Sequence, residues 1–337
     1  MINTISDQQS AVILIAGAGQ LGSRYLQGLA NCQNTLDIYV QDISKQSLQI
    51  AKQRWEEACQ TTVAINGVLT DPSYQNQITF VSSFDKLPKQ IDIAIVATNA
   101  DVRPQVVKQI AAKCDVQFWI LEKILAQSVT ELDDLFTLTQ NSTGAWVNNS
   151  RRMMTWHQQI REKLQSDIPL NITGSGSLWG MACNGIHYLD LVSWWTDEKL
   201  KGIDASKLDS KWIESKRKGF FEVTGEISAV YSGGTRLVLE SSLEGSPFKI
   251  NVEGHNSVWE IDESKGIAFG SDGIIITGNN KTQSSMTSKL VDDILAGKNC
   301  ELPKLSDSVE LHRIFLSSLL EHWNNVNSRN DDTLPIT

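Results

Sequence analysis

Short apolar runs alternate with segments of helical periodicity through residues 1–149. The first run, AVILIA, begins at Ala11, and after a glycine-rich turn Leu21, Tyr25 and Leu29 recur at helical spacing. Later apolar runs, with helical or turn segments between them, are LDIYVQD, ITFVSS, IDIAIVATNA, VQFWILEK and GAWVNN. Continuous apolar runs are typical of strands buried on both faces of a parallel sheet. The alternation predicts a doubly wound parallel sheet of the Rossmann type, which binds ligands beyond the carboxyl ends of its strands.

Residues 150–337 follow a different pattern, in which apolar and polar positions alternate with a period of two. Ile227, Ala229 and Tyr231 share one face of such a run, and Trp259 and Ile261 share one face of another. Together with turn sequences such as SGG and SDG, this period predicts a mainly antiparallel open sheet flanked by helices. We expect helices on one face and a partner subunit on the other, in a homodimer or homotetramer.

Composition argues against nucleic acid, a metal ion and a membrane as partners of this chain. The formal net charge of −9 disfavours a polyanion such as nucleic acid. The five cysteines are scattered and lack the close pairs of a metal site, so we predict reduced thiols and no metal. The N-terminal stretch MINTISDQQS is polar, and no segment approaches the roughly 18 consecutive apolar residues of a membrane span. We expect a cytoplasmic protein with no membrane partner.

The turn after the first apolar run has the spacing G-x-G-x-x-G, which binds dinucleotides when it joins a strand to a helix. Asp42 closes the next strand 20 residues after Gly22, where its carboxylate can accept hydrogen bonds from an adenosine ribose. That carboxylate would repel a 2′-phosphate, so NAD is the expected cofactor, although nearby Lys45 leaves NADP open. The alternative is a glycine-rich turn with an incidental aspartate. The predicted cofactor residues here are Gly17, Gly19, Gln20, Leu21, Gly22 and Asp42.

The two patterns together predict a fold of the α/β plus α+β class with two domains, which the length of 337 residues also favours. Residues 1–149 are expected to form the dinucleotide-binding Rossmann domain. Residues 150–337 are expected to bind the substrate and to mediate oligomerisation.

The strand VQFWILEK ends in Glu122 and Lys123 at the sheet edge where a nicotinamide ring would lie. We predict that Glu122 lies beside the cofactor. A partly desolvated lysine at this edge can hold a substrate hydroxyl and stabilise the oxyanion that develops as hydride leaves its carbon. The alternative is a solvated lysine at a strand end, paired with a neighbouring carboxylate.

Three short motifs occur in order along the chain: the glycine turn at 17–22, Glu122-Lys123-Ile124, and GIHYLD at 185–190. In this order they resemble the family of glucose–fructose oxidoreductase, inositol dehydrogenase and MocA, over nearly the full length. That family has G-x-G-x-x-G, then E-K-P, then G-x-H-x-x-D at the start of a helix. Two positions depart from it: Ile124 replaces the proline, and Cys183 stands where many members have an aspartate.

The resemblance implies NAD(P)-dependent oxidation or reduction at a carbinol carbon of a sugar, sugar derivative or cyclitol. It implies that His187 is the general base and that Lys123 steadies the reacting oxygen. It also implies that Thr98 and Asn99 lie near the ribose and nicotinamide. Without the resemblance, His187 reads as a half-buried histidine near the start of a helix. Asp190, three residues on, either fixes the imidazole ring or caps the helix.

Arg151 and Arg152 follow the last strand of the first domain, where paired guanidinium groups could grip a phosphate or carboxylate of the substrate. A solvated junction with one salt bridge is the alternative. If they bind an anion, sugar phosphates and nucleotide sugars become the preferred substrates. Trp194 and Trp195 would suit either stacking on sugar rings or core packing. The candidate substrate-binding residues are Arg151, Arg152, Asn184 and Asp190.

Three functions fit these features. The first is an NAD-dependent dehydrogenase of a sugar or sugar derivative. The second is a regulator that binds dinucleotide and sugar without turnover, which the replacement at Cys183 mildly favours. The third is a glycoside hydrolase that uses tightly held NAD to oxidise its substrate, eliminate and restore it.

Overall fold

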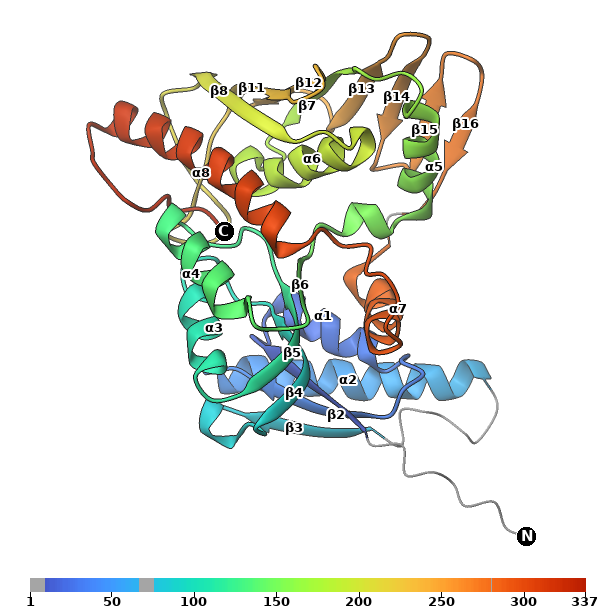
Figure 1. Ribbon diagram of the computed structural model, residues 1–337, viewed down its shortest axis with the longest axis vertical. Helices are drawn as coiled ribbons and strands as arrows, with labels where there is room; N and C mark the ends of the chain where they lie inside the picture. Colours follow the sequence, from blue (N-terminus) through green and yellow to red (C-terminus); the bar gives the residue numbers. More distant parts are fainter. Residues whose placement is uncertain (1–9, 67–75, 280) are drawn as a thin grey trace.

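The computed structural model describes residues 10–66, 76–279 and 281–337, which form two halves (Figure 1). One half contains a parallel sheet between two layers of helices. The other contains a larger, mostly antiparallel sheet with helices against one face. The predicted α/β plus α+β fold class is confirmed.

The sheet of the first half has the strand order β3-β2-β1-β4-β5-β6, and each neighbouring pair is parallel. Its strands are β1 (Ala11–Ala16), β2 (Leu36–Gln41), β3 (Gln77–Val81), β4 (Gln90–Val96), β5 (Asp115–Leu121) and β6 (Gly144–Val147). Its helices are α1 (Gln20–Leu29), α2 (Lys45–Asn66), α3 (Arg103–Ala111) and α4 (Val129–Thr139), with a short 3₁₀ turn, η2 (Phe84–Lys86).

Strand β1 shows why the first apolar runs are continuous. Ile13 and Ile15 pack into the core on the side of α1 and α2, and Leu14 and Ala16 pack into the core on the side of α3 and α4. Because successive side chains of a strand point to opposite faces, a strand covered on both faces must be apolar at every position. The continuous apolar runs of the sequence thus correspond to burial of the strand on both faces.

The second half begins with the 3₁₀ turn η3 (Ser150–Met153) and contains the large sheet. Its strands are β7 (Asn171–Ser177), β8 (Leu200–Leu208), β11 (Gly225–Tyr231), β12 (Arg236–Ser242), β13 (Lys249–Glu253), β14 (Val258–Asp262), β15 (Ile267–Gly270) and β16 (Ile275–Thr277). The two strands β9 (Ile213–Glu214) and β10 (Phe221–Glu222) form a separate hairpin. The helices are α5 (Thr155–Leu164), α6 (Met181–Thr196), α7 (Gln283–Leu295) and α8 (Leu305–Asn327).

The large sheet has the order β16-β15-β14-β13-β7-β12-β11-β8. Its neighbours are antiparallel except for β7 and β12, which are parallel. The predicted alternation is confirmed in β11, where Ile227, Ala229 and Tyr231 are buried and Val230 between them is 46% exposed. Helices α6 and α8 pack on the buried side. A partner subunit on the exposed side stays a prediction.

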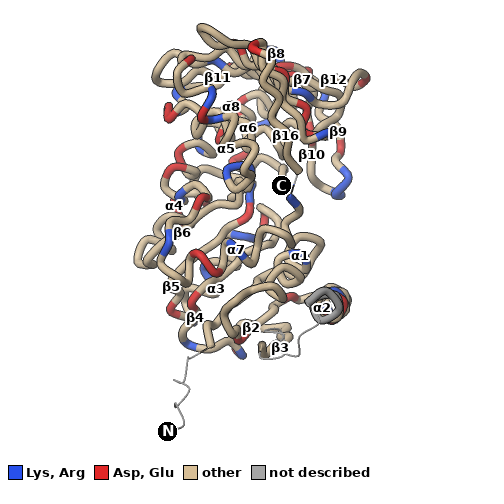
Figure 2. The backbone as a smooth tube through the Cα atoms, turned by 90° about the vertical axis from the view of Figure 1, so that its right-hand side faces the viewer, with Lys and Arg blue, Asp and Glu red and all other residues tan. Residues whose placement is uncertain are grey.

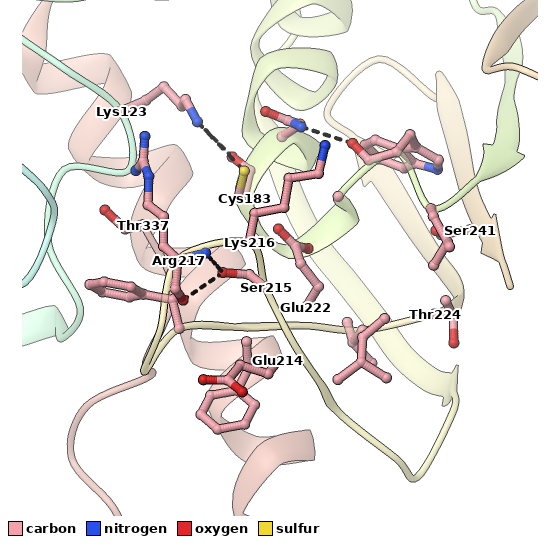
Figure 3. A pocket seen from close by; sticks show the side chains of 18 residues that line it. Lys123, Cys183, Glu214, Ser215, Lys216, Arg217, Glu222, Thr224, Ser241 and Thr337 are labelled. Atoms are coloured by element: carbon pink, nitrogen blue, oxygen red, sulfur yellow. Dashed lines mark hydrogen bonds between the residues drawn. The ribbon is translucent and has the colours of Figure 1, made fainter. Parts of the chain in front are cut away.

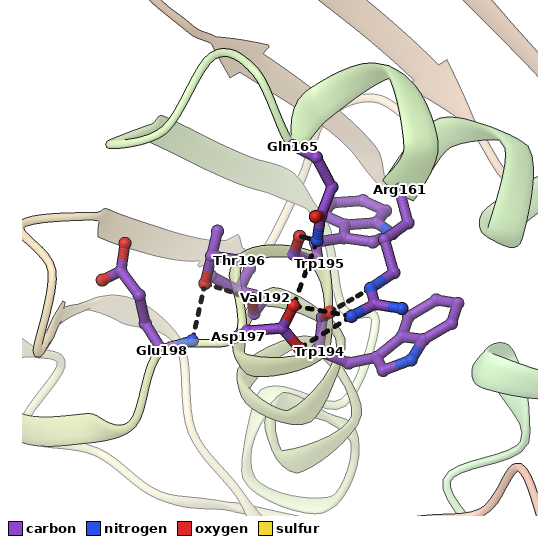
Figure 4. Close-up of polar contacts among 8 residues, drawn as sticks. All are labelled: Arg161, Gln165, Val192, Trp194, Trp195, Thr196, Asp197 and Glu198. Carbon is purple, nitrogen blue, oxygen red and sulfur yellow. Dashed lines mark hydrogen bonds and ion pairs between the residues drawn. The ribbon is translucent and has the colours of Figure 1, made fainter.

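Arg161 of α5 holds the carboxyl end of α6 in place (Figure 4). Its guanidinium donates hydrogen bonds of 2.7 Å to the Asp197 carboxylate and to the Trp194 carbonyl oxygen. The guanidinium carbon also lies over the Trp194 ring, 5.2 Å from its centre. Trp195 is 1% exposed and belongs to the core. Both tryptophans therefore contribute to packing, and the sugar-stacking alternative is not supported for either.

Helix α7 returns from the second half to cover α1. A Cβ added at Gly28 of α1 would lie 2.4 Å from the Ser284 carbonyl oxygen of α7, so only glycine permits this approach. Leu290 and Ile294 of α7 join the core beneath β1 and α1. The division at 149/150 stays a prediction, with the added finding that one helix of the second segment covers the first.

Among the described residues, no helix is both long and apolar enough to span a bilayer.

Candidate active site

The turn between β1 and α1 is tightly packed on one side and open on the other. Gly17 has a φ of +94°, in the left-handed region that favours glycine. A Cβ at Gly22 would lie 1.7 Å from the Gly17 carbonyl oxygen, whereas a Cβ at Gly19 would meet nothing within 4 Å. Helix α1 begins at Gln20, and no side chain caps its first amide groups. These N–H groups and the helix dipole can therefore bind an anion on the open side.

Asp42 follows β2 and is fixed beside this turn. One carboxylate oxygen accepts a hydrogen bond of 2.7 Å from the Ala18 N–H, and the other accepts one of 2.7 Å from the Ser44 N–H. Each oxygen keeps a lone pair, so the carboxylate can also accept from two ribose hydroxyls. The structure thus brings Asp42 to the turn, as the sequence spacing predicted.

A cleft of about 220 Å³ lies at the carboxyl edge of the parallel sheet. It gathers residues from the β1–α1 turn, the β4–α3 loop and the end of β5, together with two residues from the second half. The lining comprises Gly19, Gln20, Leu21, Ala97, Thr98, Asn99, Arg103, Glu122, Lys123, Arg217 and Thr337. Seven of these residues are among the predicted cofactor or catalytic residues. Three more predicted residues, Gly17, Gly22 and Asp42, do not line the cleft but hold the β1–α1 turn in its conformation.

Glu122 is held at the bottom of this cleft and is 3% exposed. Its carboxylate accepts hydrogen bonds from the Tyr25 hydroxyl at 2.5 Å and from the Asn148 amide at 2.6 Å. Burial raises the pKa of Glu122, although these two hydrogen bonds oppose that shift. The Glu122 carboxylate is thus hydrogen-bonded to side chains of this chain, which indicates a structural role in the wall of the cleft.

Arg103 ties together the two loops that border the cleft. Its guanidinium is 1% exposed and donates to the carbonyl oxygens of Thr98, Ile124 and Leu125, the last at 3.1 Å. Burial lowers its pKa to about 10. Arg103 has no signal in the sequence, because an arginine in the first turn of a helix cannot be told from a solvated one by its pattern.

Lys123 lies where the cleft meets a larger cavity and lines both. Its ammonium donates to the Cys183 carbonyl oxygen at 3.1 Å and lies 3.9 Å from the Cys183 sulfur. The Lys123–Ile124 peptide bond is cis. The lysine predicted at the end of β5 therefore faces the first turn of α6 across the junction of the two halves.

The larger cavity has a volume of about 510 Å³ and lies between the start of α6 and the β9–β10 hairpin (Figure 3). Trp179, Phe220 and Phe221 supply aromatic surface. Lys123, Lys216 and Arg217 supply positive charge, and Glu214 and Glu222 supply negative charge. Asn184, a predicted substrate residue, also lines this cavity, and its amide donates to the Trp179 carbonyl oxygen at 2.8 Å.

His187 lies on α6, one turn beyond Cys183, and is half-buried. Its Nδ1 is buried and has no hydrogen-bond partner within the described chain. Burial, and then the positive charges of Arg151 and Lys123, hold its pKa well below the ordinary value of 6.5. The ring is therefore neutral near pH 7, as a proton acceptor must be. His187 is not among the residues that line either cavity, so its predicted role as base stays a prediction.

The two candidate arginines are each bound to a carboxylate of this chain. Arg152 grips Asp190 with two hydrogen bonds of 2.9 and 2.6 Å, and Arg151 grips Glu263 with two of 2.6 and 2.8 Å. His157 contacts the same Glu263 carboxylate at 3.0 Å. Both pairs are largely buried. This pairing favours a structural role at the junction over direct binding of a substrate anion.

Four residues of the site come from segments without a recognisable motif. Lys216, Arg217 and Glu222 belong to the β9–β10 hairpin, and Thr337 lies at the end of the described chain. The Thr337 hydroxyl accepts a hydrogen bond of 2.9 Å from the Ala100 N–H of the β4–α3 loop. The basic run KWIESKRK at 211–218 was the one sequence signal that could have drawn attention to this hairpin.

No protein-family model and no curated protein matches this sequence.

Solved structures match nearly the whole chain at low identity. A myo-inositol dehydrogenase from Lactobacillus casei, in complex with NAD(H) and myo-inositol, has a TM-score of 0.66 at 14% identity, covering 96% of this chain and 96% of that one. An oxidoreductase from Agrobacterium radiobacter, in complex with NAD+, L-tartaric acid and magnesium, has a TM-score of 0.67 at 13% identity, with coverages of 95% and 99%. A UDP-N-acetylglucosamine 3-dehydrogenase from Acidithiobacillus ferrooxidans has a TM-score of 0.67 at 12% identity, with coverages of 95% and 99%. These similarities confirm the α/β plus α+β fold that the two sequence patterns predicted.

Proposed function

We propose that the protein is an NAD-dependent oxidoreductase that transfers hydride between nicotinamide and the carbinol carbon of a sugar-like alcohol. The observation that carries this proposal is the position of Lys123, whose side chain lines both the dinucleotide cleft and the larger cavity. A lysine at that junction can act on an alcohol oxygen whose carbon faces the cofactor. Such a placement favours turnover over the alternative of binding alone.

The cleft fits a dinucleotide by its own structure. The space beside Gly19 is open, and the uncapped amides of α1 point to it. The Thr98 hydroxyl is buried at the cleft without a hydrogen-bond partner among the described residues. An unpaired buried hydroxyl is costly, and a bound cofactor would satisfy it. When bound, NAD supplies the carbon that accepts hydride.

Asp42 supports NAD over NADP. Its carboxylate is held at the ribose end of the turn by two backbone N–H groups, so it cannot easily swing away from a 2′-phosphate. The solved structures of similar fold from Lactobacillus casei and Agrobacterium radiobacter contain NAD(H) or NAD+. Lys45, exposed at the start of α2, is the cation that would have to offset the Asp42 charge for NADP to bind.

In the proposed reaction the substrate hydroxyl lies against the Lys123 ammonium. As hydride leaves the carbon, the Lys123 charge stabilises the negative charge that grows on oxygen, and His187 takes the hydroxyl proton. The products are a carbonyl group, reduced nicotinamide and protonated His187. Glu222 lines the same cavity and is a second possible proton acceptor, because burial raises its pKa.

The test is the absorbance of reduced nicotinamide when the protein is mixed with NAD or NADP and a panel of polyols, uronic acids, sugar phosphates and nucleotide sugars. We expect absorbance to rise with at least one substrate and faster with NAD. Cofactor that stays bound and shows no net reduction while a glycosidic bond is cleaved would indicate the hydrolase instead. Dinucleotide binding with no reduction on any substrate, in either direction, would overturn the proposal.

A further inference from the structure

The β9–β10 hairpin carries an unusual concentration of positive charge. Residues 211–218 contain four basic residues and one acidic residue, a net charge of 4 − 1 = +3, in a chain whose net charge is −9. Three of the four, Lys216, Arg217 and Lys218, lie in the turn between β9 and β10, which Figure 2 shows in blue. Positive charge maintained against an acidic background is typical of a site that attracts an anion.

Two of these basic side chains face the larger cavity. Lys216 and Arg217 line it, and Figure 3 shows both extending from the hairpin into the space that Lys123 and Cys183 border. No described carboxylate forms an ion pair with Lys216 or Arg217. The one side-chain hydrogen bond of Arg217 within the described chain is a long one of 3.4 Å, to the neutral amide oxygen of Asn99.

The hairpin backbone holds these two residues in place. The Ser215 hydroxyl accepts from the Arg217 N–H at 3.1 Å and donates to the Arg217 carbonyl oxygen at 3.0 Å. Gly219, with a φ of +83°, closes the turn. At the base of the hairpin, the Phe221 N–H donates to the Pro335 carbonyl oxygen at 2.8 Å. These hydrogen bonds fix the backbone of the loop that carries Lys216 and Arg217.

The two carboxylates of the cavity are occupied elsewhere. Glu222 accepts from the Ala182 N–H at 2.8 Å, at the first turn of α6, and Glu214 accepts from the Gly219 N–H at 3.2 Å within the hairpin. Three cations and two carboxylates therefore line the cavity, and neither carboxylate neutralises Lys216 or Arg217. The charge of those two residues remains available to a ligand.

The aromatic lining of the cavity suits a sugar ring. Trp179 is held by a hydrogen bond of 2.9 Å from its indole N–H to the Glu240 carbonyl oxygen and by a ring contact with Phe248 at 4.6 Å. A fixed aromatic face of this kind packs against the C–H face of a pyranose or cyclitol. The cavity thus offers an aromatic wall, a reactive lysine at one end and unpaired cations on the hairpin.

We propose that the substrate is a sugar or cyclitol that carries an anionic group, a carboxylate or a phosphate, and that Lys216 and Arg217 bind that group; this inference rests on the proposed function for its assignment of the cavity to the substrate. Lys216 distinguishes the substrate anion from the cofactor phosphates. It lines only the larger cavity, whereas Arg217 lines the dinucleotide cleft as well. The anion site therefore lies on the hairpin and not at Arg151 and Arg152, whose charges are paired.

The test is calorimetric titration of the NAD-saturated protein with D-glucuronate, D-glucose 6-phosphate and D-glucose, which share one ring and differ in charge. We expect one anion to bind roughly tenfold to a hundredfold more tightly than glucose, because a charge-assisted hydrogen bond contributes on that scale. Which anion binds more tightly distinguishes a carboxylate site from a phosphate site. The preference should shrink as NaCl rises from about 50 to about 500 mM.

Lys216→Ala should remove most of that preference, and Lys218→Ala, a lysine of the same hairpin that does not line the cavity, should leave it within about twofold. Equal binding of all three sugars, failure of both anions to bind, or equal losses in the two variants would overturn the inference. Hydride transfer is followed separately by absorbance. An anion preference without any hydride transfer would overturn the proposed function but support the anion site. Hydride transfer from neutral alcohols without an anion preference would support the proposed function but overturn the anion site.

Discussion

Among single residues of the site, some charged side chains are hydrogen-bonded to charged or polar side chains of this chain, and others are not. Glu122 and Asp190 are buried, and each carboxylate accepts two hydrogen bonds from side chains of this chain. Lys123 is the contrasting case, because its ammonium contacts only neutral atoms of Cys183, the carbonyl oxygen at 3.1 Å and the sulfur at 3.9 Å, among the hydrogen bonds of the described residues, and lies at the junction of two cavities. An ammonium has three N–H donors, so this one can take a substrate oxygen without giving up its support.

The identity of the proton acceptor can be resolved between His187 and Glu222. We expect His187→Asn to lower kcat by roughly a hundredfold or more, since general base catalysis contributes on that scale. Glu222→Gln, which keeps the hydrogen bond with the Ala182 N–H, should lower kcat by less than about tenfold.

The pH profile of kcat/KM provides the second readout. Because the pKa of His187 is held well below 6.5, the wild-type rate should stay level down to pH 6.5 and fall only at lower pH. If Glu222→Gln abolishes that acidic fall while His187→Asn leaves it in place, the proton acceptor is Glu222.

Among the elements, the β1–α1 turn must pack closely on one side, at Gly22, and leave space for a ligand on the other, at Gly19. Separate variants can test these two requirements. Gly22→Ala would force a Cβ against the Gly17 carbonyl oxygen, so we expect the free energy of unfolding to fall by roughly 1–3 kcal/mol or more. Gly19→Ala meets nothing in the chain and should change it by less than about 0.5 kcal/mol.

The matched readout is dinucleotide affinity by calorimetry. Because the side of the turn at Gly19 is where the pyrophosphate would lie, Gly19→Ala should weaken NAD binding by roughly tenfold or more in a protein of normal stability. Normal NAD affinity in that variant would place the dinucleotide elsewhere.

Helix α8 carries a buried histidine that links folding to pH. His312 is 0% exposed and donates from Nδ1 to the Ser308 carbonyl oxygen at 2.7 Å, and burial lowers its pKa to about 3. His312 therefore binds a proton near pH 6.5 in the unfolded chain, but only near pH 3 in the folded chain. Its contribution to stability is complete above pH 6.5 and is lost as pH falls toward 3.

His312→Asn, which retains an N–H donor, should therefore flatten the fall in the free energy of unfolding below pH 6.5, by up to about 1.4 kcal/mol per pH unit. His255→Asn, a change at an exposed histidine, serves as the control. Equal slopes for His312→Asn and the wild type in urea titrations at several pH values would show that His312 titrates normally in the folded state.

The elements with long periodic patterns could be predicted from the sequence, and short or distant ones could not. Strand β1 and its turn have a continuous apolar run and three glycines, and β11 has a clean period of two. The β9–β10 hairpin has two residues in each strand, too few to show a period. For Arg151 and Arg152 the sequence leaves an anion site and a salt bridge both open, because a local sequence does not reveal that Glu263 and Asp190 lie opposite them.

At the scale of the whole molecule, residues 334–337 connect the two halves. The Leu334 N–H donates to the Gln127 carbonyl oxygen at 2.8 Å, and the Gln127 amide donates to the Ile336 carbonyl oxygen at 2.9 Å. Leu334 and Ile336 are both 0% exposed. Through Pro335 the same segment accepts a hydrogen bond from Phe221 at the base of the β9–β10 hairpin, so it contacts both halves.

Deleting residues 334–337 should destabilise the fold and loosen the site together. Loss of two buried aliphatic side chains costs roughly 3–6 kcal/mol, so the melting temperature should fall by several degrees, as scanning calorimetry can measure. Thr337→Val, which removes only the acceptor for the Ala100 N–H, should cost about 1–3 kcal/mol. A truncated protein that melts like the wild type would show that this segment does not join the halves.

The proposed role of Lys123 is to act on the reacting oxygen between the two cavities. Its most direct test compares wild type and Lys123→Ala with the best substrate of the absorbance panel, alongside calorimetric titration of NAD. We expect kcat/KM to fall by roughly 10²–10⁴-fold while the Kd for NAD changes by less than about threefold. A variant that reduces NAD at the wild-type rate, or that loses activity only because NAD no longer binds, would contradict it.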